Sequence, residues 1–316
     1  MRLAKIAIPL LALIFHISHC EAFELIGKGW DSQVIHLIVP FSAGTGVDTL
    51  ARIMAPELSK SLNKPVVVEN KPGASGNIGT AFVKNSRSGN SNLLVTASTI
   101  TTNFTTNPQL NVNPITELSS IALIAVNDLV LVVPESSPFL SAAMLISKSK
   151  EKPELVTFGS PGIGTPHYKA MGLFEKSTHT TLLHIPFKDS ATAISSLLGG
   201  EIDSMFLPIN IAKPLIESNK IRALGVAANV RSSIMKNIPT LKEQGIGNVN
   251  CPIWYGVFAS NMISKQEESK LTQLLHVLMN DPAIKSQIEK QGLIPKLIIG
   301  SRFRQLIESD VNSLGN

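Results

Sequence analysis

The sequence is poor in cysteine, in charge and in aromatic side chains. It has only two cysteines, Cys20 and Cys251, among 316 residues, with 16% charged and 5% aromatic residues. This cysteine content excludes a disulfide-rich scaffold, and no Cys/His spacing matches a zinc site. The formal net charge is +5, but Lys and Arg form no cluster of the kind that binds nucleic acid. We therefore expect no metal, no cofactor and no nucleic-acid partner.

Long apolar runs are also missing, except at the N-terminus. A basic start, an apolar run over residues 6–15 and the segment 20–22 predict a secretory signal peptide over residues 1–22. We expect cleavage after Ala22; a lipoprotein cleaved before Cys20 is the alternative. No later run reaches the roughly 18 apolar residues of a membrane-spanning helix.

Short runs rich in Val, Ile and Leu alternate with helical patterns along the rest of the chain. The runs that predict strands are residues 34–39, 65–70, 92–97, 128–134, 154–160, 181–187, 203–208 and 221–227. Helices are expected near 46–62 and 76–85, after Ser264, after Asp281 and from Ser301. Such alternation is typical of a parallel sheet covered by helices, so the sequence predicts an α/β fold.

Two glycine-rich turns follow predicted strands and open predicted helices. The first, SAGTG, covers Ser42–Gly46, and the second, SPGIGT, covers Ser160–Thr165. Gly44 and Gly162 lie 118 positions apart, which suggests two α/β lobes with one such loop each. N–H groups at a helix start attract anions, and small residues let a ligand approach them. Neither turn contains Arg or Lys, which favours a carboxylate held by neutral donors, with the Ser and Thr hydroxyls as further donors.

Other interpretations of these turns fit less well. Gly44 and Gly46 begin a dinucleotide fingerprint, but Thr49 occupies the third glycine position, and no Lys completes a Walker loop. Ordinary tight turns between strand and helix remain an alternative for either loop alone. No G-x-S-x-G motif supports a hydrolase triad, which could be drawn from Ser42, Ser160, His167, Asp48 and Asp203.

Three aspartates near the predicted loops leave their roles open. Asp48 lies in the first turn of its helix, where it either serves the helix dipole or contacts an amino or hydroxyl group of a ligand. Asp203 begins a predicted strand and is expected to face the ligand or the hinge. Asp189, beside Lys188, is expected to be solvated near a helix start, where Asp commonly caps.

Seven collinear segments resemble the solute-binding receptors of tripartite tricarboxylate transporters, also called Bug receptors. They include residues 35–58, 156–174 and, as the most recognisable, 65–83. The resemblance implies a type II periplasmic binding protein, with two α/β lobes, a two-strand hinge and a ligand cleft between the lobes. Lobe 1 is expected to comprise residues 23–125 and 250–316, and lobe 2 residues 126–249.

The resemblance also implies a function and a set of contacts. A periplasmic monomer of this kind captures a small carboxylated compound and delivers it to integral-membrane transporter subunits, without catalysing a reaction. A receptor for a signalling partner and a secreted serine hydrolase using Ser160 and His167 are the alternatives. The ligand contacts implied by the family are Phe41, Ser42, Ala43, Gly44, Thr45, Gly46, Asp48, Ser98, Thr99, Ser160, Gly162, Gly164, Thr165 and His167, to which Asp203 is added from its position.

Two residues depart from the pattern of the family. Thr45 stands where the family usually has one of two paired glycines, so its Cβ would narrow the pocket or its hydroxyl would donate to the ligand. Asp189 is unusual for its segment and would disfavour a second ligand carboxylate if it faced the cleft.

Overall fold

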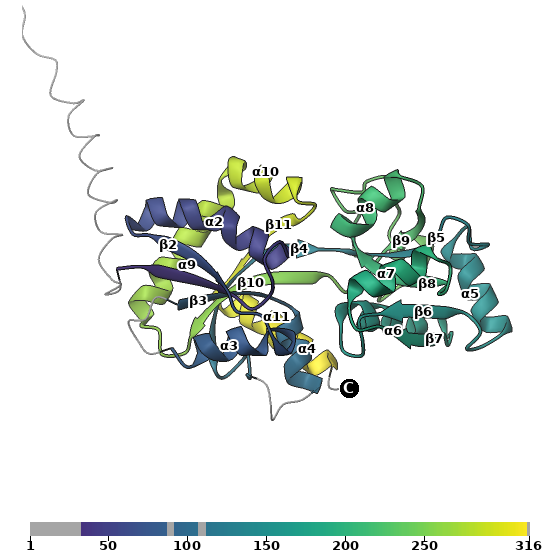
Figure 1. The fold of residues 1–316 in the computed structure, drawn as a ribbon, viewed down its shortest axis with the longest axis horizontal. Coiled ribbons are helices and arrows are strands. Elements are labelled where there is room, and N and C mark those ends of the chain that lie inside the picture. The colour runs from purple at the N-terminus through teal and green to yellow at the C-terminus, as the bar shows by residue number, and fades with distance from the viewer. Residues whose placement is uncertain (1–32, 87–91, 107–111, 315–316) are drawn as a thin grey trace, which may run out of the picture.

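The computed structural model describes residues 33–86, 92–106 and 112–314, and the signal peptide predicted over residues 1–22 lies outside them. These residues form two sheets, each covered by helices, which lie side by side (Figure 1). The predicted α/β class is confirmed. Among the described residues, every helix is too short or too polar to span a lipid bilayer.

The first sheet has six strands in the order β11-β4-β10-β3-β1-β2. The strands are β1 (Ile35–Val39), β2 (Val66–Asn70), β3 (Asn92–Ala97), β4 (Leu118–Asn127), β10 (Ile253–Ser260) and β11 (Ile294–Ile299). Its helices are α2 (Gly46–Leu62), α3 (Asn77–Lys84), α4 (Thr99–Thr106), α9 (Lys265–Asn280), α10 (Pro282–Lys290) and α11 (Gly300–Leu314).

Helices cover both faces of this sheet because its strands alternate apolar side chains to either side. In β3, Leu93 and Val95 join the core under α2, α9 and α10, whereas Leu94 joins the core that contains Phe303 and Ile307 of α11. Figure 1 shows α3 and α4 on the same side as α11. The inward faces of the first and last helices include Leu50, Met54 and Leu58 of α2 and Phe303 and Ile307 of α11, all of which are buried.

The second sheet has five strands in the order β7-β6-β8-β5-β9. The strands are β5 (Leu129–Pro134), β6 (Thr157–Ser160), β7 (Leu183–Pro186), β8 (Ser204–Pro208) and β9 (Ile221–Val226). Its helices are α5 (Ala142–Glu151), α6 (Pro166–Thr178), α7 (Ser190–Leu198) and α8 (Ile209–Glu217). Two short 3-10 turns complete the described elements: η1 (Ala74–Gly76), between β2 and α3, and η2 (Lys242–Gln244), between β9 and β10.

The predicted parallel pairing holds for β1 with β2 and β3 and for β6 with β7 and β8, but both sheets also contain antiparallel strands. Strand β10 runs antiparallel to β3 and β4, β11 runs antiparallel to β4, and β5 runs antiparallel to β8 and β9. The reason is the path of the chain between the sheets. It leaves the first sheet at the end of β4, enters the second through β5 after the single residue Asp128, and returns in the segment before β10. The lobe boundaries near 125 and 250 stay a prediction.

Candidate functional site

The first glycine turn joins β1 to α2. Its last residue, Thr45, caps the helix: Oγ1 accepts a hydrogen bond from the N–H of Asp48 (3.4 Å) and donates to the carbonyl of Ser42 (2.9 Å). A hydroxyl has one proton, and here it is already donated. Thr45 therefore closes the turn, and the expected donation from its hydroxyl to a ligand does not fit this geometry.

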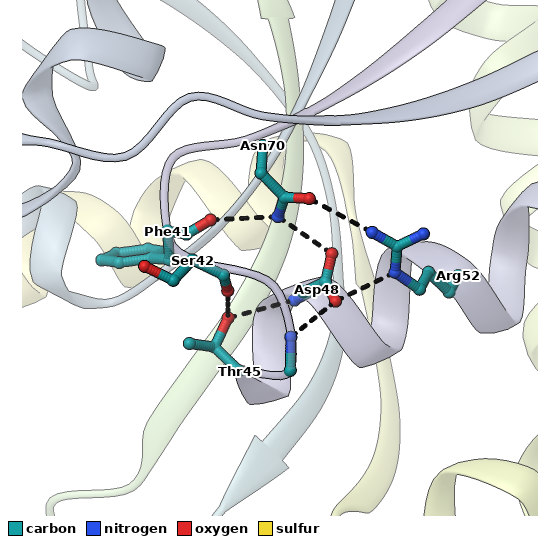
Figure 2. Close-up of polar contacts among 7 residues, drawn as sticks. Phe41, Ser42, Thr45, Asp48, Arg52 and Asn70 are labelled. Carbon is teal, nitrogen blue, oxygen red and sulfur yellow. Dashed lines mark hydrogen bonds and ion pairs between the residues drawn. The ribbon is translucent and has the colours of Figure 1, made fainter.

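Behind this turn lies a group of three polar side chains, Asp48, Asn70 and Arg52, which we call the Asp48 cluster (Figure 2). Asp48 is only 2% exposed. Its Oδ2 accepts hydrogen bonds from the N–H of Gly44 (2.8 Å) and Nε of Arg52 (2.9 Å), and its Oδ1 accepts one from Nδ2 of Asn70 (2.9 Å). Asn70 also donates to the carbonyl of Phe41 (3.0 Å) and accepts from Arg52 (3.1 Å).

These contacts keep Asp48 ionised. Burial by itself would raise the pKa of this carboxyl, but hydrogen bonds from Arg52, Gly44 and Asn70 outweigh it and lower the pKa below its ordinary value. Asp48 lies in the first turn of α2, where the helix dipole favours a carboxylate, and both of its oxygens are engaged within the protein rather than directed to a ligand.

Sequence reasoning missed Arg52 and Asn70, although signals for both exist. Asp48 and Arg52 are four residues apart on one helix, a spacing that brings side chains together. Asn70 ends β2 opposite Val39 at the end of β1, and the carboxyl ends of adjacent parallel strands lie at the same edge of a sheet.

The second glycine turn joins β6 to α6 and has the same construction. Thr165 caps the helix: its Oγ1 accepts from the N–H of Tyr168 (3.4 Å) and donates to the carbonyl of Gly162 (2.8 Å). Pro166 follows at the first helical position, where its missing N–H costs no hydrogen bond. As in the first turn, the capping hydroxyl is not available to a ligand.

When the two turns are aligned by their backbone angles, Gly44 is matched by a different glycine from Gly162. Gly44 and Gly164 both have φ of 84°, and Thr45 and Thr165 have nearly equal backbone angles. Gly44 therefore matches Gly164, at 120 positions, and the pairing with Gly162 at 118 positions was wrong. The capping threonines, Thr45 and Thr165, set this correspondence, and each directly follows its matched glycine.

Ser160, at the start of the second turn, contacts a histidine that the sequence did not indicate. Its Oγ lies 2.8 Å from Nε2 of His184, whose ring stacks on Phe158 at 4.7 Å between centroids. His167, the predicted partner, is buried, and its Nδ1 has no hydrogen-bond partner among the described residues. Burial lowers the pKa of His184, and lowers that of His167 to about 4, so both rings are neutral near pH 7. The hydroxyl of Ser160 is hydrogen-bonded to His184, and among the described residues no hydrogen bond joins it to His167, so the structure does not show the predicted pair of Ser160 and His167.

Two of the aspartates considered above have structural partners. Asp203 accepts hydrogen bonds from the N–H (2.8 Å) and Oγ1 (2.9 Å) of Thr157, at the amino end of β6 and β8. The second turn follows the carboxyl end of β6, so the structure does not bring Asp203 to the predicted loops. Asp189 caps α7 and accepts from the N–H and Oγ1 of Thr192 (2.8 and 2.7 Å), as its position predicted.

The third predicted contact region is the start of α4. The hydroxyls of Ser98 and Thr99 are buried and have no hydrogen-bond partner within the described part of the chain. The second turn packs directly on this helix, because a Cβ built at Gly164 would lie 2.9 Å from Cγ2 of Thr102 and 2.8 Å from Cγ2 of Thr106. The second turn therefore lies against the helix that Thr99 begins, at Thr102 and Thr106.

A cavity of about 330 Å³ lies between the lobes next to this contact. Its walls include Ser98 and Thr102 of the first lobe, Pro166 and Lys169 of α6, and Trp254 and Asp310. Lys169 Nζ lies 3.3 Å from Asp310 Oδ1, and Nε1 of Trp254 donates to Asp310 Oδ2 (2.8 Å), so a polar connection crosses between the lobes. The first turn does not line this cavity.

Comparison with known proteins gives consistent matches over nearly all of the chain. Residues 50–316 match the family model described as tripartite tricarboxylate transporter family receptor. A UPF0065 protein from the tcbD-tcbE intergenic region of Pseudomonas sp. strain P51 is 28% identical over 284 residues, 90% of this chain and 84% of that protein. Protein BugT of Bordetella pertussis is 26% identical over 284 residues, 89% of this chain and 87% of that protein.

Solved structures match to a similar extent. A periplasmic transporter superposes with a TM-score of 0.77 and 27% identity, over 91% of this chain and 96% of that one. MatC from Rhodopseudomonas palustris with bound malate has a TM-score of 0.74 and 21% identity, over 90% and 99%. Rpa4515 of R. palustris with adipate has a TM-score of 0.77 and 24% identity, over 90% and 96%. The predicted type II periplasmic binding protein fold is confirmed.

Proposed function

The chain belongs to the tripartite tricarboxylate transporter receptor family, and we propose that it captures a small carboxylated compound outside the cytoplasm and passes it to the membrane subunits of such a transporter. In this proposal lobe 1 comprises residues 23–125 and 250–316, and lobe 2 residues 126–249. The ligand lies between the lobes, which close on it by hinge motion at the two crossings of the chain.

One observation carries the ligand class: each lobe presents a capped glycine turn in which several N–H groups lack a protein acceptor among the described residues. They are those of Ser42, Ala43, Gly46 and Val47 at the first turn and the start of α2, and those of Ile163, Gly164 and His167 at the second turn and the start of α6. Neutral donors at two helix starts suit a carboxylate, whose oxygens only accept. The buried hydroxyls of Ser98 and Thr99 supply further donors.

The solved relatives support acids of modest size. Malate and adipate, bound to MatC and Rpa4515, are both dicarboxylates. As the cap of α7, Asp189 keeps its negative charge, and its effect on a second ligand carboxylate stays a prediction. We therefore propose that aliphatic dicarboxylates are the first compounds to test.

A thermal-shift screen tests the proposal most directly. Malate, adipate, other mono-, di- and tricarboxylates, amino acids and aromatic acids would be added at millimolar concentration, with chloride at equal ionic strength as the control. A ligand present at 100 times its Kd stabilises the folded state by about 2.7 kcal/mol, a shift of several degrees. If no acid raises Tm above the chloride control, carboxylate capture is refuted.

Export and delivery need separate experiments. Expression of the full chain in a Gram-negative host, followed by fractionation and N-terminal sequencing, should give a periplasmic protein that begins at Phe23; a lipidated product beginning at Cys20 would favour the lipoprotein alternative. Delivery requires uptake of the bound acid by proteoliposomes that hold the membrane subunits. Uptake that is independent of the receptor would contradict that part of the proposal.

A further inference from the structure

We propose that the Asp48 cluster positions the first turn for ligand binding and reserves the N–H of Gly44, so that a ligand carboxylate uses the other amides of the site. This inference rests on the proposed function and deepens it. Asp48, Asn70 and Arg52 are positioning residues here, because they act on the ligand through the backbone of the turn.

The contacts of the cluster hold the turn at its start and at its middle. Asn70 donates to the carbonyl of Phe41, just before the turn (3.0 Å), and Asp48 accepts from the N–H of Gly44 at its centre (2.8 Å). Asn70 also donates to Asp48 (2.9 Å), so one buried carboxylate fixes both points, the first of them through Asn70. Hydrogen bonds to a charged group are stronger than neutral ones, so this half of the site is shaped before a ligand arrives.

The second turn supplies an internal comparison. The residue that corresponds to Asp48 is Tyr168, whose ring packs against Phe158 and His184 at centroid distances of 6.1 and 4.8 Å. Among the described residues, no carboxylate accepts from the N–H of Gly164 as Asp48 does from that of Gly44, and this N–H has no other acceptor. A capped glycine turn of this geometry thus forms without a buried carboxylate, so Asp48 is not needed for the turn as such.

Charge explains why Arg52 belongs to the cluster. An ionised Asp48 next to a site for anions would repel the ligand, and the guanidinium of Arg52, 2.9 Å away, compensates for that charge. Arg52 is 53% exposed and forms no part of the core, so its removal should disturb binding more than folding. Arg304 and Glu308 of α11 form the same type of pair, at i and i+4 with Nε–Oε1 of 3.0 Å and 51% exposure of the arginine, and serve as the matched control.

The experiment compares Asp48→Asn, Arg52→Met and the control Arg304→Met with the unchanged protein. Hydrogen exchange of the Gly44 amide, followed by NMR without any ligand, reports the reserved N–H. We expect it to be protected in the unchanged protein and to exchange at least tenfold faster in Asp48→Asn. Calorimetry with malate and with adipate should give a roughly tenfold higher Kd for Arg52→Met, which leaves the charge of Asp48 uncompensated, and no change for Arg304→Met.

Each outcome decides for or against the inference. Fast exchange of Gly44 in the unchanged protein, or a large chemical-shift change at this amide when acid binds, would show that Gly44 is available to the ligand. Equal Kd values for Arg52→Met and Arg304→Met would reject the role of charge compensation. If neither acid binds the unchanged protein, the proposed function fails for these acids, whereas the exchange of Gly44 still decides whether its N–H is reserved.

Discussion

The contact of the second turn with α4 makes Gly164→Ala the most informative single substitution. In this protein a Cβ at position 164 would lie 2.8 Å from Cγ2 of Thr106, whereas ordinary contacts begin near 3.4 Å. Cγ2 of Thr106 cannot simply rotate away, because Oγ1 of the same side chain donates to the carbonyl of Thr102 (2.9 Å). The second turn must therefore withdraw from the first lobe to admit the added Cβ.

The expected size of the effect has two parts. An L-residue in the left-handed region, at φ of 84°, costs about 1–2 kcal/mol of folding free energy wherever it occurs. Overpacking across the contact adds about 1–3 kcal/mol to the state in which the lobes touch. If that state binds the acid, the overpacking term alone weakens binding by about 5- to 150-fold.

The control separates backbone strain from the contact. Gly162→Ala, in the same turn, has a positive φ of 115° with no atom within 4 Å of the added Cβ. Both variants should lower Tm, but only Gly164→Ala should raise the Kd measured by calorimetry with the acid that gives the largest thermal shift. An equal Kd for the two variants would refute the reasoning, because the second turn would then not rest on α4 in the bound state.

Three further predictions follow from contacts described above. Replacing Thr45 by Val removes the capping hydroxyl and should lower the free energy of unfolding in urea by about 1 kcal/mol, whereas Thr45→Gly should cost a few tenths; equal losses would contradict the cap. Burial raises the pKa of Asp128 to about 6, above its unfolded value of 3.8. The contribution of this group to the free energy of unfolding should therefore be greatest below pH 4 and fall as pH rises to 6, by at most about 3 kcal/mol. Asp128→Asn should abolish that pH dependence. Lys169→Gln removes the 3.3 Å ion pair with Asp310 and should weaken acid binding a few-fold and reduce the salt dependence of that binding. Asp310→Asn, which alters the acceptor of Trp254 Nε1, should shift the fluorescence emission of Trp254. An unchanged salt dependence of binding would argue against a role for the pair.

Local patterns predicted local structure well. The apolar spacing over residues 46–62 gave α2, and the helix predicted after Ser264 is α9, whose start Ser264 and Glu267 cap reciprocally. Asp281 caps α10 as expected, and α11 begins one residue before the predicted Ser301. These features depend on residues within one or two turns of each other, which a single sequence contains.

Features that depend on distant residues were missed. Strands β4, β10 and β11 were not predicted, because their direction is set by pairing with strands far along the chain. In the site, both glycine turns were found from sequence, but Asn70 reaches Asp48 only through the register of two strands, and His184 reaches Ser160 from a neighbouring strand. The choice of His167 over His184 followed its nearness in sequence, which is not nearness in space.

The order of strands in the first sheet has a consequence for how the chain acquires its fold. Strand β10 lies between β3 and β4, yet it is synthesised after the whole second sheet. Until residues 253–260 emerge, β3 and β4 both expose apolar strand edges, whereas the second sheet is already complete at β9. Because unpaired edges invite association between chains, the first lobe stays open to such association until β10 has paired with β3 and β4.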